Sequence, residues 1–203
     1  MRKRITGAAL VAATTLLALH SPSYQQEDSK PTVSVQQDKV IASTSLMDEA
    51  LVIPTGQVPV TLVDTIDGDT IKVRVKGKIE TVRYLLIDTP ESKKPDMCVQ
   101  PYAKEAFLRN DGLVKSGTLT IEYEQGNIRD AYGRLLAYVY IDGQSVQGTL
   151  LKEGFARVAY IMSPPYKYLV LYRDVESLAR REKLNIWSRQ NFVTRWGFSG
   201  CVP

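Results

Sequence analysis

The chain has 203 residues, of which 44% are hydrophobic and 24% are charged. This composition is typical of a soluble globular protein of about one domain, and it excludes a collagen-like, wholly disordered or multi-span membrane chain. The net charge of +4 falls to +1 if Arg2, Lys3 and Arg4 are removed with the leader described below, so bulk charge says little about partners. The only histidine is His20, also in that leader, which excludes histidine-based catalysis and histidine-ligated zinc in the mature chain.

Residues 1–23 have the pattern of a secretory signal peptide. The basic residues precede an apolar run over residues 5–19, and Ser21 and Ser23 place small side chains at positions −3 and −1 of a cleavage site. This run is short for a membrane-spanning helix, which needs about 20 residues, and an uncleaved anchor is the alternative. We therefore expect a secreted, extracellular protein, or a membrane-anchored one if the leader is retained. Residues 24–57 are polar and lack apolar periodicity, which predicts a disordered tether or propeptide.

The folded domain is expected to span residues 58–188, and its first half has the alternation of β-strands. Apolar and basic side chains alternate through residues 70–76, as on a strand with one buried face. Gly77 follows this segment and predicts a hairpin turn. Five strands are predicted, over residues 58–63, 70–76, 79–87, 118–124 and 135–141.

Helical spacing of apolar residues distinguishes three other segments of the domain. Gly154 follows the second of them and predicts its end. The order is three strands, one helix, two strands and two helices, which suits an α+β fold: a five-stranded Greek-key barrel of the OB type with three helices. Many such barrels bind oligonucleotides or oligosaccharides, but the fold alone does not define the function. The helices are predicted over residues 100–115, 145–153 and 166–183.

Two short acidic segments flank the predicted hairpin and form a candidate metal site. The hairpin would bring Asp69 back toward Asp88. Calcium takes six to eight oxygen ligands, so these two carboxylates, with a backbone carbonyl near Thr89, suit a calcium ion. Glu91 lies three residues beyond Asp88 and could accept a proton from a metal-held water. Without histidine, a carboxylate is the natural candidate for the general base.

Two arginines complete this candidate site. Guanidinium groups bind phosphate bidentately, so Arg83 and Arg134 could clamp a phosphodiester and stabilise the charge that develops as water attacks. Arg83 and Asp88 are five residues apart, and strict alternation would place them on opposite faces of a strand. The hypothesis therefore requires the strand to bend, bulge or end near Asp88. Each motif taken alone also suits a hairpin turn, a helix N-cap or a surface ion pair.

From about residue 60 to residue 188 the sequence resembles the staphylococcal nuclease (thermonuclease) family of secreted calcium-dependent nucleases. That family has an OB barrel with three helices, and it hydrolyses DNA and RNA, single strands preferentially, to 3′-phosphorylated products. The resemblance implies a phosphodiesterase with a nucleic-acid substrate, and nothing in the sequence demands more than a monomer. Five motifs carry it in order: IDGDT at 66–70, VRYLLIDTPES at 82–92, DAYGRLLAYVY at 130–140, GFARVAY at 154–160 and EKLNIWS at 182–188.

The resemblance also implies roles for individual residues. Where the family enzyme has a second pocket tyrosine, this chain has Met162, which packs against bases but donates no hydroxyl hydrogen bond. The matched positions are the calcium ligands Asp69, Asp88 and Thr89, the general base Glu91, the phosphate-binding Arg83 and Arg134, and the pocket-lining Tyr132 and Tyr160.

Cys98 and Cys201 are the only cysteines of the chain. A secreted protein with two cysteines is expected to form one disulfide, and free or intermolecular thiols are the alternative. The bond would join the loop after Glu91 to a C-terminal extension, residues 189–203, which the core of the family does not require. The extension contains three aromatic residues that could pack against the domain.

A second class of function is a non-catalytic OB-fold module that binds nucleic acid or another protein. A domain that has lost catalysis would be expected to lack some of the metal carboxylates, Glu91 or the arginines. All of them are present, which favours the enzyme. An oligosaccharide-binding module would explain neither the paired arginines nor the acidic cluster.

Overall fold

The fold is described from a computed structural model of the chain. It describes residues 56–93, 98–126, 128–162 and 165–202. The predicted signal peptide and all but the last two residues of the predicted tether lie outside these ranges, and the predicted domain boundaries stay predictions. Among the described residues, no helix combines the length and the apolar character needed to cross a bilayer.

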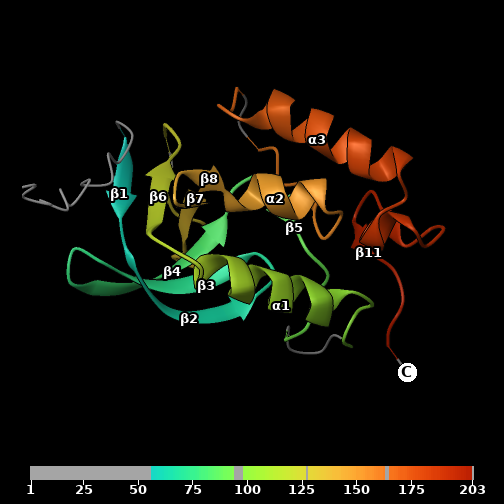
Figure 1. The fold of residues 1–203 in the computed structure, drawn as a ribbon, viewed down its shortest axis with the longest axis horizontal. Helices are drawn as coiled ribbons and strands as arrows, with labels where there is room; N and C mark the ends of the chain where they lie inside the picture. The colour runs from blue at the N-terminus through green and yellow to red at the C-terminus, as the bar shows by residue number, and fades with distance from the viewer. Residues whose placement is uncertain (1–55, 94–97, 127, 163–164, 203) are drawn as a thin grey trace, which may run out of the picture. The chain divides into compact units, whose positions relative to one another are not determined.

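The described residues form an α+β fold with three α-helices, as predicted, and their main sheet is mixed (Figure 1). The main sheet runs in the order β1-β6-β7-β4-β3-β2, with β8 paired to β7. β4 and β7 are parallel, and the other neighbours are antiparallel. The strands are β1 (Gln57–Pro59), β2 (Thr61–Asp67), β3 (Thr70–Val75), β4 (Lys78–Tyr84), β5 (Ile87–Asp88), β6 (Leu119–Tyr123), β7 (Leu135–Ile141), β8 (Gln144–Ser145), β9 (Arg157–Val158), β10 (Val193–Thr194) and β11 (Gly197–Phe198). The helices are α1 (Ala103–Val114), α2 (Val146–Lys152), α3 (Leu169–Arg181) and the short 3-10 helix η1 (Asn185–Trp187).

The hairpin of β3 and β4 forms where the sequence predicts it. Ile71 and Val73 are fully buried, whereas Lys72 and Arg74 on the opposite face are exposed. The strands are joined by two residues, one of them Gly77, with φ angles of 49° and 81°. Two-residue turns with positive φ at both positions match the twist of a hairpin, and glycine adopts such angles without strain.

The first predicted strand divides at Val60, between β1 and β2. β1 pairs with β6, whereas β2 pairs with β3, and the Val60 N–H donates to the Leu119 carbonyl at 3.0 Å. The two edges of the main sheet are therefore consecutive segments of the chain. This division, together with the two-residue β8, gives the sheet seven strands in the described residues where five were predicted.

The three predicted helices are present, each with ends within three residues of the prediction. α2 packs against both α1 and α3, so it lies between them (Figure 1). Its N-terminus is capped because the Ser145 hydroxyl accepts the Gly148 N–H at 3.0 Å. Leu150 and Leu151 on α2 are fully buried against the sheet, together with Tyr138 of β7.

The C-terminal extension packs onto the domain through one buried aromatic residue. Phe192 is 1% exposed, and its ring lies 5.6 Å from Tyr102 and 5.4 Å from Phe198, centroid to centroid. The predicted disulfide is confirmed: Cys98 and Cys201 are bonded across 103 sequence positions, with their Cα atoms 5.6 Å apart.

Replacing both cysteines by serine is expected to lower the free energy of unfolding by about 2–4 kcal/mol, because the bond restricts a long loop of the unfolded chain. For a domain of this size the corresponding fall in Tm is roughly 5–15 °C. Thermal unfolding of the parent and of the Cys98→Ser/Cys201→Ser variant, each with and without reductant, measures it. Reductant should lower the Tm of the parent to that of the variant and leave the variant unchanged. Equal Tm values for the two oxidised proteins would contradict the expectation.

Candidate active site

A buried cluster of acids and arginines forms at the start of β3 and the end of β4, which lie side by side in the hairpin. The register of this hairpin pairs Thr70 with Arg83, and the Tyr84 N–H donates to the Asp69 carbonyl at 2.9 Å. Arg83 Nη2 therefore lies 3.1 Å from Asp69 Oδ2, and it also lies 3.4 Å from Asp88 Oδ1. These three charged residues are all less than 10% exposed. One guanidinium thus pairs with two buried carboxylates.

Strand β4 ends at Tyr84, which satisfies the requirement that Arg83 and Asp88 face one site. Leu86 follows with a φ of 65°, which turns the chain before the two-residue β5. Arg83 Nη1 bridges this turn by donating to the carbonyls of Tyr84 and Ile87, at 3.1 and 3.0 Å. The predicted strand over residues 79–87 is therefore interrupted, and the interruption brings Asp88 back toward Arg83.

Arg157 is a member of this cluster that sequence reasoning missed. β9 pairs with β5 and sets Arg157 opposite Asp88. Arg157 Nε and Nη2 lie 3.0 and 2.9 Å from Asp88 Oδ2. The Tyr160 hydroxyl donates to Asp88 Oδ1 at 3.4 Å, and the Arg83 guanidinium lies 5.1 Å from the Tyr160 ring centroid. The signal available was the segment GFARVAY, from which only the tyrosine was selected.

The turn between β2 and β3 adds a further acid and holds Thr89 close. Asp67 Oδ1 accepts the N–H of Asp69 at 3.1 Å, and Asp69 Oδ2 accepts the N–H of Thr89 at 2.9 Å. A Cβ atom on Gly68 would lie 2.6 Å from Thr89 Oγ1, so glycine is needed for this approach. Burial, and then the charge of Asp69, raise the pKa of Asp67 to about 7.

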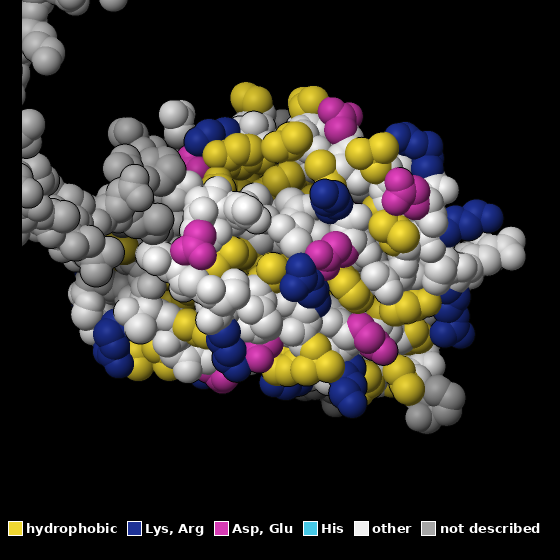
Figure 2. Space-filling view, in the orientation of Figure 1, with side chains coloured by type: hydrophobic (Ala, Val, Ile, Leu, Met, Phe, Trp, Pro, Cys, Tyr) yellow, Lys and Arg dark blue, Asp and Glu magenta, His cyan; other side chains and the backbone are white. Residues whose placement is uncertain are grey.

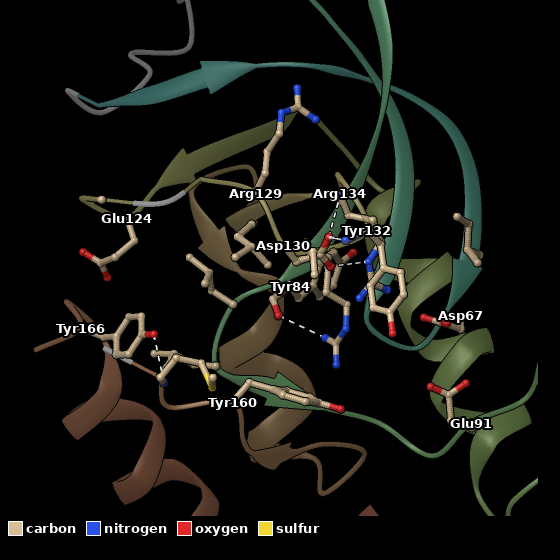
Figure 3. A pocket seen from close by; sticks show the side chains of 18 of the residues that line it. Asp67, Tyr84, Glu91, Glu124, Arg129, Asp130, Tyr132, Arg134, Tyr160 and Tyr166 are labelled. Atoms are coloured by element: carbon tan, nitrogen blue, oxygen red, sulfur yellow. Dashed lines mark hydrogen bonds and ion pairs between the residues drawn. The ribbon is translucent and has the colours of Figure 1, made fainter. Parts of the chain in front are cut away.

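A cavity of about 1230 Å³ adjoins this cluster and is lined in part by Arg83 and Asp67. Figure 3 shows Asp67 and Glu91 near one end of it and Glu124 and Tyr166 near the other, with Tyr160 between. The three predicted calcium ligands are buried and do not belong to its lining. The predicted residues that do line it are Arg83, Glu91, Tyr132, Arg134 and Tyr160.

Arg134 reaches the cavity from a different position than Arg83. The Arg134 side-chain Nε lies 2.6 Å from Asp130 Oδ2, and the Arg134 backbone N–H donates to Asp130 Oδ1 at 2.9 Å. Burial acts to raise the pKa of Asp130, but these hydrogen bonds from Arg134 hold it below its ordinary value. The guanidinium also lies 5.5 Å from the ring centroid of Tyr132, which is 86% exposed. Arg134 is thus held by Asp130, outside the buried cluster.

The backbone of Glu91 is held by Gln100, a second residue that sequence reasoning missed. The Glu91 N–H donates to Gln100 Oε1 at 2.8 Å, and the Gln100 N–H donates to the Glu91 carbonyl at 3.0 Å. Gln100 Nε2 donates in turn to the Phe198 carbonyl at 3.0 Å. The C-terminal extension therefore supports the position of Glu91 through one buried side chain.

The donor atoms of the buried cluster fit a hard cation. Among the described residues, no group of three or more His, Cys, Asp or Glu side chains is arranged to hold a metal ion. Two carboxylates, Asp69 and Asp88, nevertheless lie within 3.4 Å of one guanidinium nitrogen, and Thr89 adjoins Asp69. This oxygen-only set suits Ca²⁺, which also accepts backbone carbonyls and water.

Comparison with known proteins gives one family-model match and three informative relatives. The model of the family described as "Staphylococcal nuclease homologue" matches residues 81–189. Endonuclease YncB of Bacillus subtilis (strain 168) is 49% identical over 205 residues, covering 98% of this chain and 97% of that protein. SPbeta prophage-derived endonuclease YokF of the same strain is 59% identical over 145 residues, covering 71% of this chain and 49% of that protein. Thermonuclease of Staphylococcus intermedius is 39% identical over 124 residues, covering 61% of this chain and 73% of that protein.

These matches assign the chain to the nucleases, a class of phosphodiesterases. More particularly, the chain belongs to the staphylococcal nuclease family. The family resemblance and the enzyme class predicted from the sequence are both confirmed. The chain spans about half the length of YokF and nearly all of YncB.

Proposed function

We propose that the protein hydrolyses phosphodiester bonds in DNA and RNA, with single strands preferred, in a calcium-dependent reaction. One observation carries the proposal. Arg83 and Glu91 line the same cavity, and Arg83 is held there by the buried Asp69 and Asp88. A guanidinium binds phosphate and a carboxylate can accept a proton as a general base. The cavity therefore contains the two groups that phosphodiester hydrolysis needs.

The scaffold of this site is an OB-type barrel. The two edges of the main sheet are consecutive segments that meet at Val60. A sheet whose edge strands are one continuous chain can curl until those edges meet, and OB barrels bind their ligands on the face of two strands and the adjoining loops. The family to which the chain belongs supports the same architecture.

Glu91 acts as the general base. It accepts a proton from the attacking water as the water oxygen bonds to phosphorus. The P–O5′ bond breaks and the departing O5′ takes up a proton from solvent water, which leaves a 3′-phosphate on one product and a 5′-hydroxyl on the other. Arg83 and Arg134 bind the phosphate oxygens, whose negative charge they stabilise as water attacks.

Asp69 and Asp88, with the carbonyl of Thr89, would hold the calcium ion. When bound, calcium supplies positive charge beside the phosphate and the attacking water. Arg83 and Arg157 fix the two carboxylates in place, since each forms an ion pair with Asp88 and Arg83 also pairs with Asp69.

Two tyrosines contact the nucleotide. Tyr132 and Tyr160 line the cavity and are 86% and 60% exposed, so each ring has accessible surface on which a base can stack. Met162, 80% exposed on the same cavity, offers a polarizable contact without a hydroxyl group. The protein acts as a monomer outside the cell, or at the membrane surface if its leader is retained.

Calcium removal tests the proposal. The purified protein should cleave single-stranded DNA and RNA in calcium, and a chelator should lower the rate by about 100-fold or more, since the cation supplies charge stabilisation. Added calcium should restore the rate, and end-group assignment should find 3′-phosphates. A protein that binds nucleic acid in calcium without cleaving it would instead be the non-catalytic binding module.

A further inference from the structure

A second hollow adjoins the cavity at Tyr160. It has a volume of about 360 Å³. Tyr160 lines both this hollow and the larger cavity, so the two are neighbours. The hollow is lined by Arg157, Val158, Ala159, Tyr160, Arg195 and Trp196.

The outer wall of this hollow comes from the C-terminal extension. β10 and β11 form a hairpin, and Arg195 and Trp196 are the two residues at its tip. Trp196 is 86% exposed. Isolated exposed side chains are common, but tryptophan is large and on average well buried.

The hairpin that carries Trp196 is firmly attached. Phe192 before it is 1% exposed, and the Phe198 carbonyl within it accepts the hydrogen bond from Gln100. The guanidinium of Arg157 lies 5.6 Å from the Phe198 ring centroid, and the disulfide at Cys201 follows shortly after. Trp196 thus lies exposed at the tip of a hairpin that these contacts fix to the domain.

The chemistry of the hollow suits a nucleotide. The guanidinium of Arg195 lies 5.0 Å from the Trp196 ring centroid, so a cation and an aromatic face are offered side by side. None of its lining residues is acidic, and the charge of Arg157 is already matched by Asp88. Aromatic rings bind single-stranded nucleic acid by stacking on its bases, and arginine binds its phosphates.

Basic side chains do not form a continuous patch on the face seen in Figure 2. There, Lys and Arg side chains are scattered and interleaved with Asp and Glu instead of gathering in one stripe. The hairpin of β10 and β11 follows residue 189, where the match to the family model ends.

We propose that Arg195 and Trp196 form an additional subsite for one nucleotide of a single-stranded substrate. The inference rests on the proposed nuclease function. The strand leaves the cavity past Tyr160, its next base stacks on Trp196, and the adjoining phosphate pairs with Arg195. The extension thereby lengthens the substrate-binding surface beyond the catalytic cavity.

Two substrates of different length test the subsite. With an oligonucleotide of about ten nucleotides, Trp196→Ala should lower kcat/KM about tenfold, which corresponds to the loss of one stacked base. With a dinucleotide, which has no nucleotide beyond the two that the scissile phosphate joins, Trp196→Ala should equal the parent. Trp196→Phe should retain most of the activity on the longer substrate, because it keeps an aromatic face. Arg195→Ala should weaken binding of the longer substrate and lower its salt dependence by the equivalent of about one phosphate contact.

Val170→Ala is the matched control, because it truncates another exposed hydrophobic side chain, 74% exposed on α3. It should leave both substrates unaffected. The proposal is overturned if Trp196→Ala cleaves the longer oligonucleotide as well as the parent does, or if it loses activity equally on both substrates. A parent that cleaves neither substrate in calcium would show instead that the nuclease proposal itself fails, and the subsite with it.

Discussion

Glu91→Gln is expected to lower kcat on single-stranded DNA by about 1,000-fold, because an amide cannot accept the proton from the attacking water. The substitution keeps the size of the side chain, and it leaves intact the two hydrogen bonds that the backbone of Glu91 forms with Gln100. KM should therefore change little. Steady-state kinetics in calcium, with the Tm of both proteins measured alongside, separate lost chemistry from lost folding.

Glu105→Gln is the control for this experiment, since Glu105 is an exposed acid in the first turn of α1. It should retain the kcat of the parent. If Glu91→Gln keeps more than a tenth of the parental kcat, Glu91 is not the general base. Asp67, which lines the same end of the cavity, would then be the next acid to replace.

Arg83→Ala is expected to have a large effect on stability as well as on activity. Removing one partner of a buried ion pair costs about 3–5 kcal/mol, because the remaining charge is left without compensation. Here two carboxylates lose their shared partner, and the carbonyls of Tyr84 and Ile87 lose a donor. The rate should also fall by about 100-fold or more through the loss of a phosphate-binding group. Urea unfolding near pH 7 and cleavage assays on the folded fraction measure the two effects separately.

The comparison for Arg83 is Arg109→Ala. Arg109 forms a bidentate ion pair with Glu153, but the two side chains are 39% and 33% exposed. Exposed pairs contribute about 1 kcal/mol or less, so this variant should remain close to the parent in stability and in rate. Similar losses of stability in the two variants would mean that Arg83 does not stabilise the buried acids. Arg83→Lys should recover little, because an ammonium cannot span the two carboxylates and two carbonyls.

Local sequence patterns were sufficient to predict one half of the candidate site. Alternation in β3 and the glycine turn after it specify a hairpin, and a hairpin of that register returns Arg83 to Asp69. The requirement that the strand bend, bulge or end near Asp88 followed from the parity of side-chain directions. Of these three alternatives the structure shows an ending, at Tyr84, three residues earlier than the predicted end of the strand.

The other half depends on contacts that leave no local pattern. Arg157 meets Asp88 through a pairing of only two residues per strand, 69 positions apart in the chain. Two residues are too few to show a period. Gln100 is a polar residue just before a helix, and its role becomes visible only when the Phe198 carbonyl, 98 positions away, accepts its hydrogen bond. The division of the first strand at Val60 was likewise invisible, because both halves have strand-like composition.

The disulfide between Cys98 and Cys201 makes most of the domain a covalent ring. Arg134, Arg157 and Tyr160 lie inside this ring, whereas Asp88 and Glu91 lie on the chain that leads into it. A single proteolytic cut between positions 98 and 201 therefore leaves every one of these residues in the same molecule. The two pieces separate only when the bond is reduced, so a nicked protein remains one covalent unit under oxidising conditions, able to keep its site assembled after damage that would divide an unlinked chain.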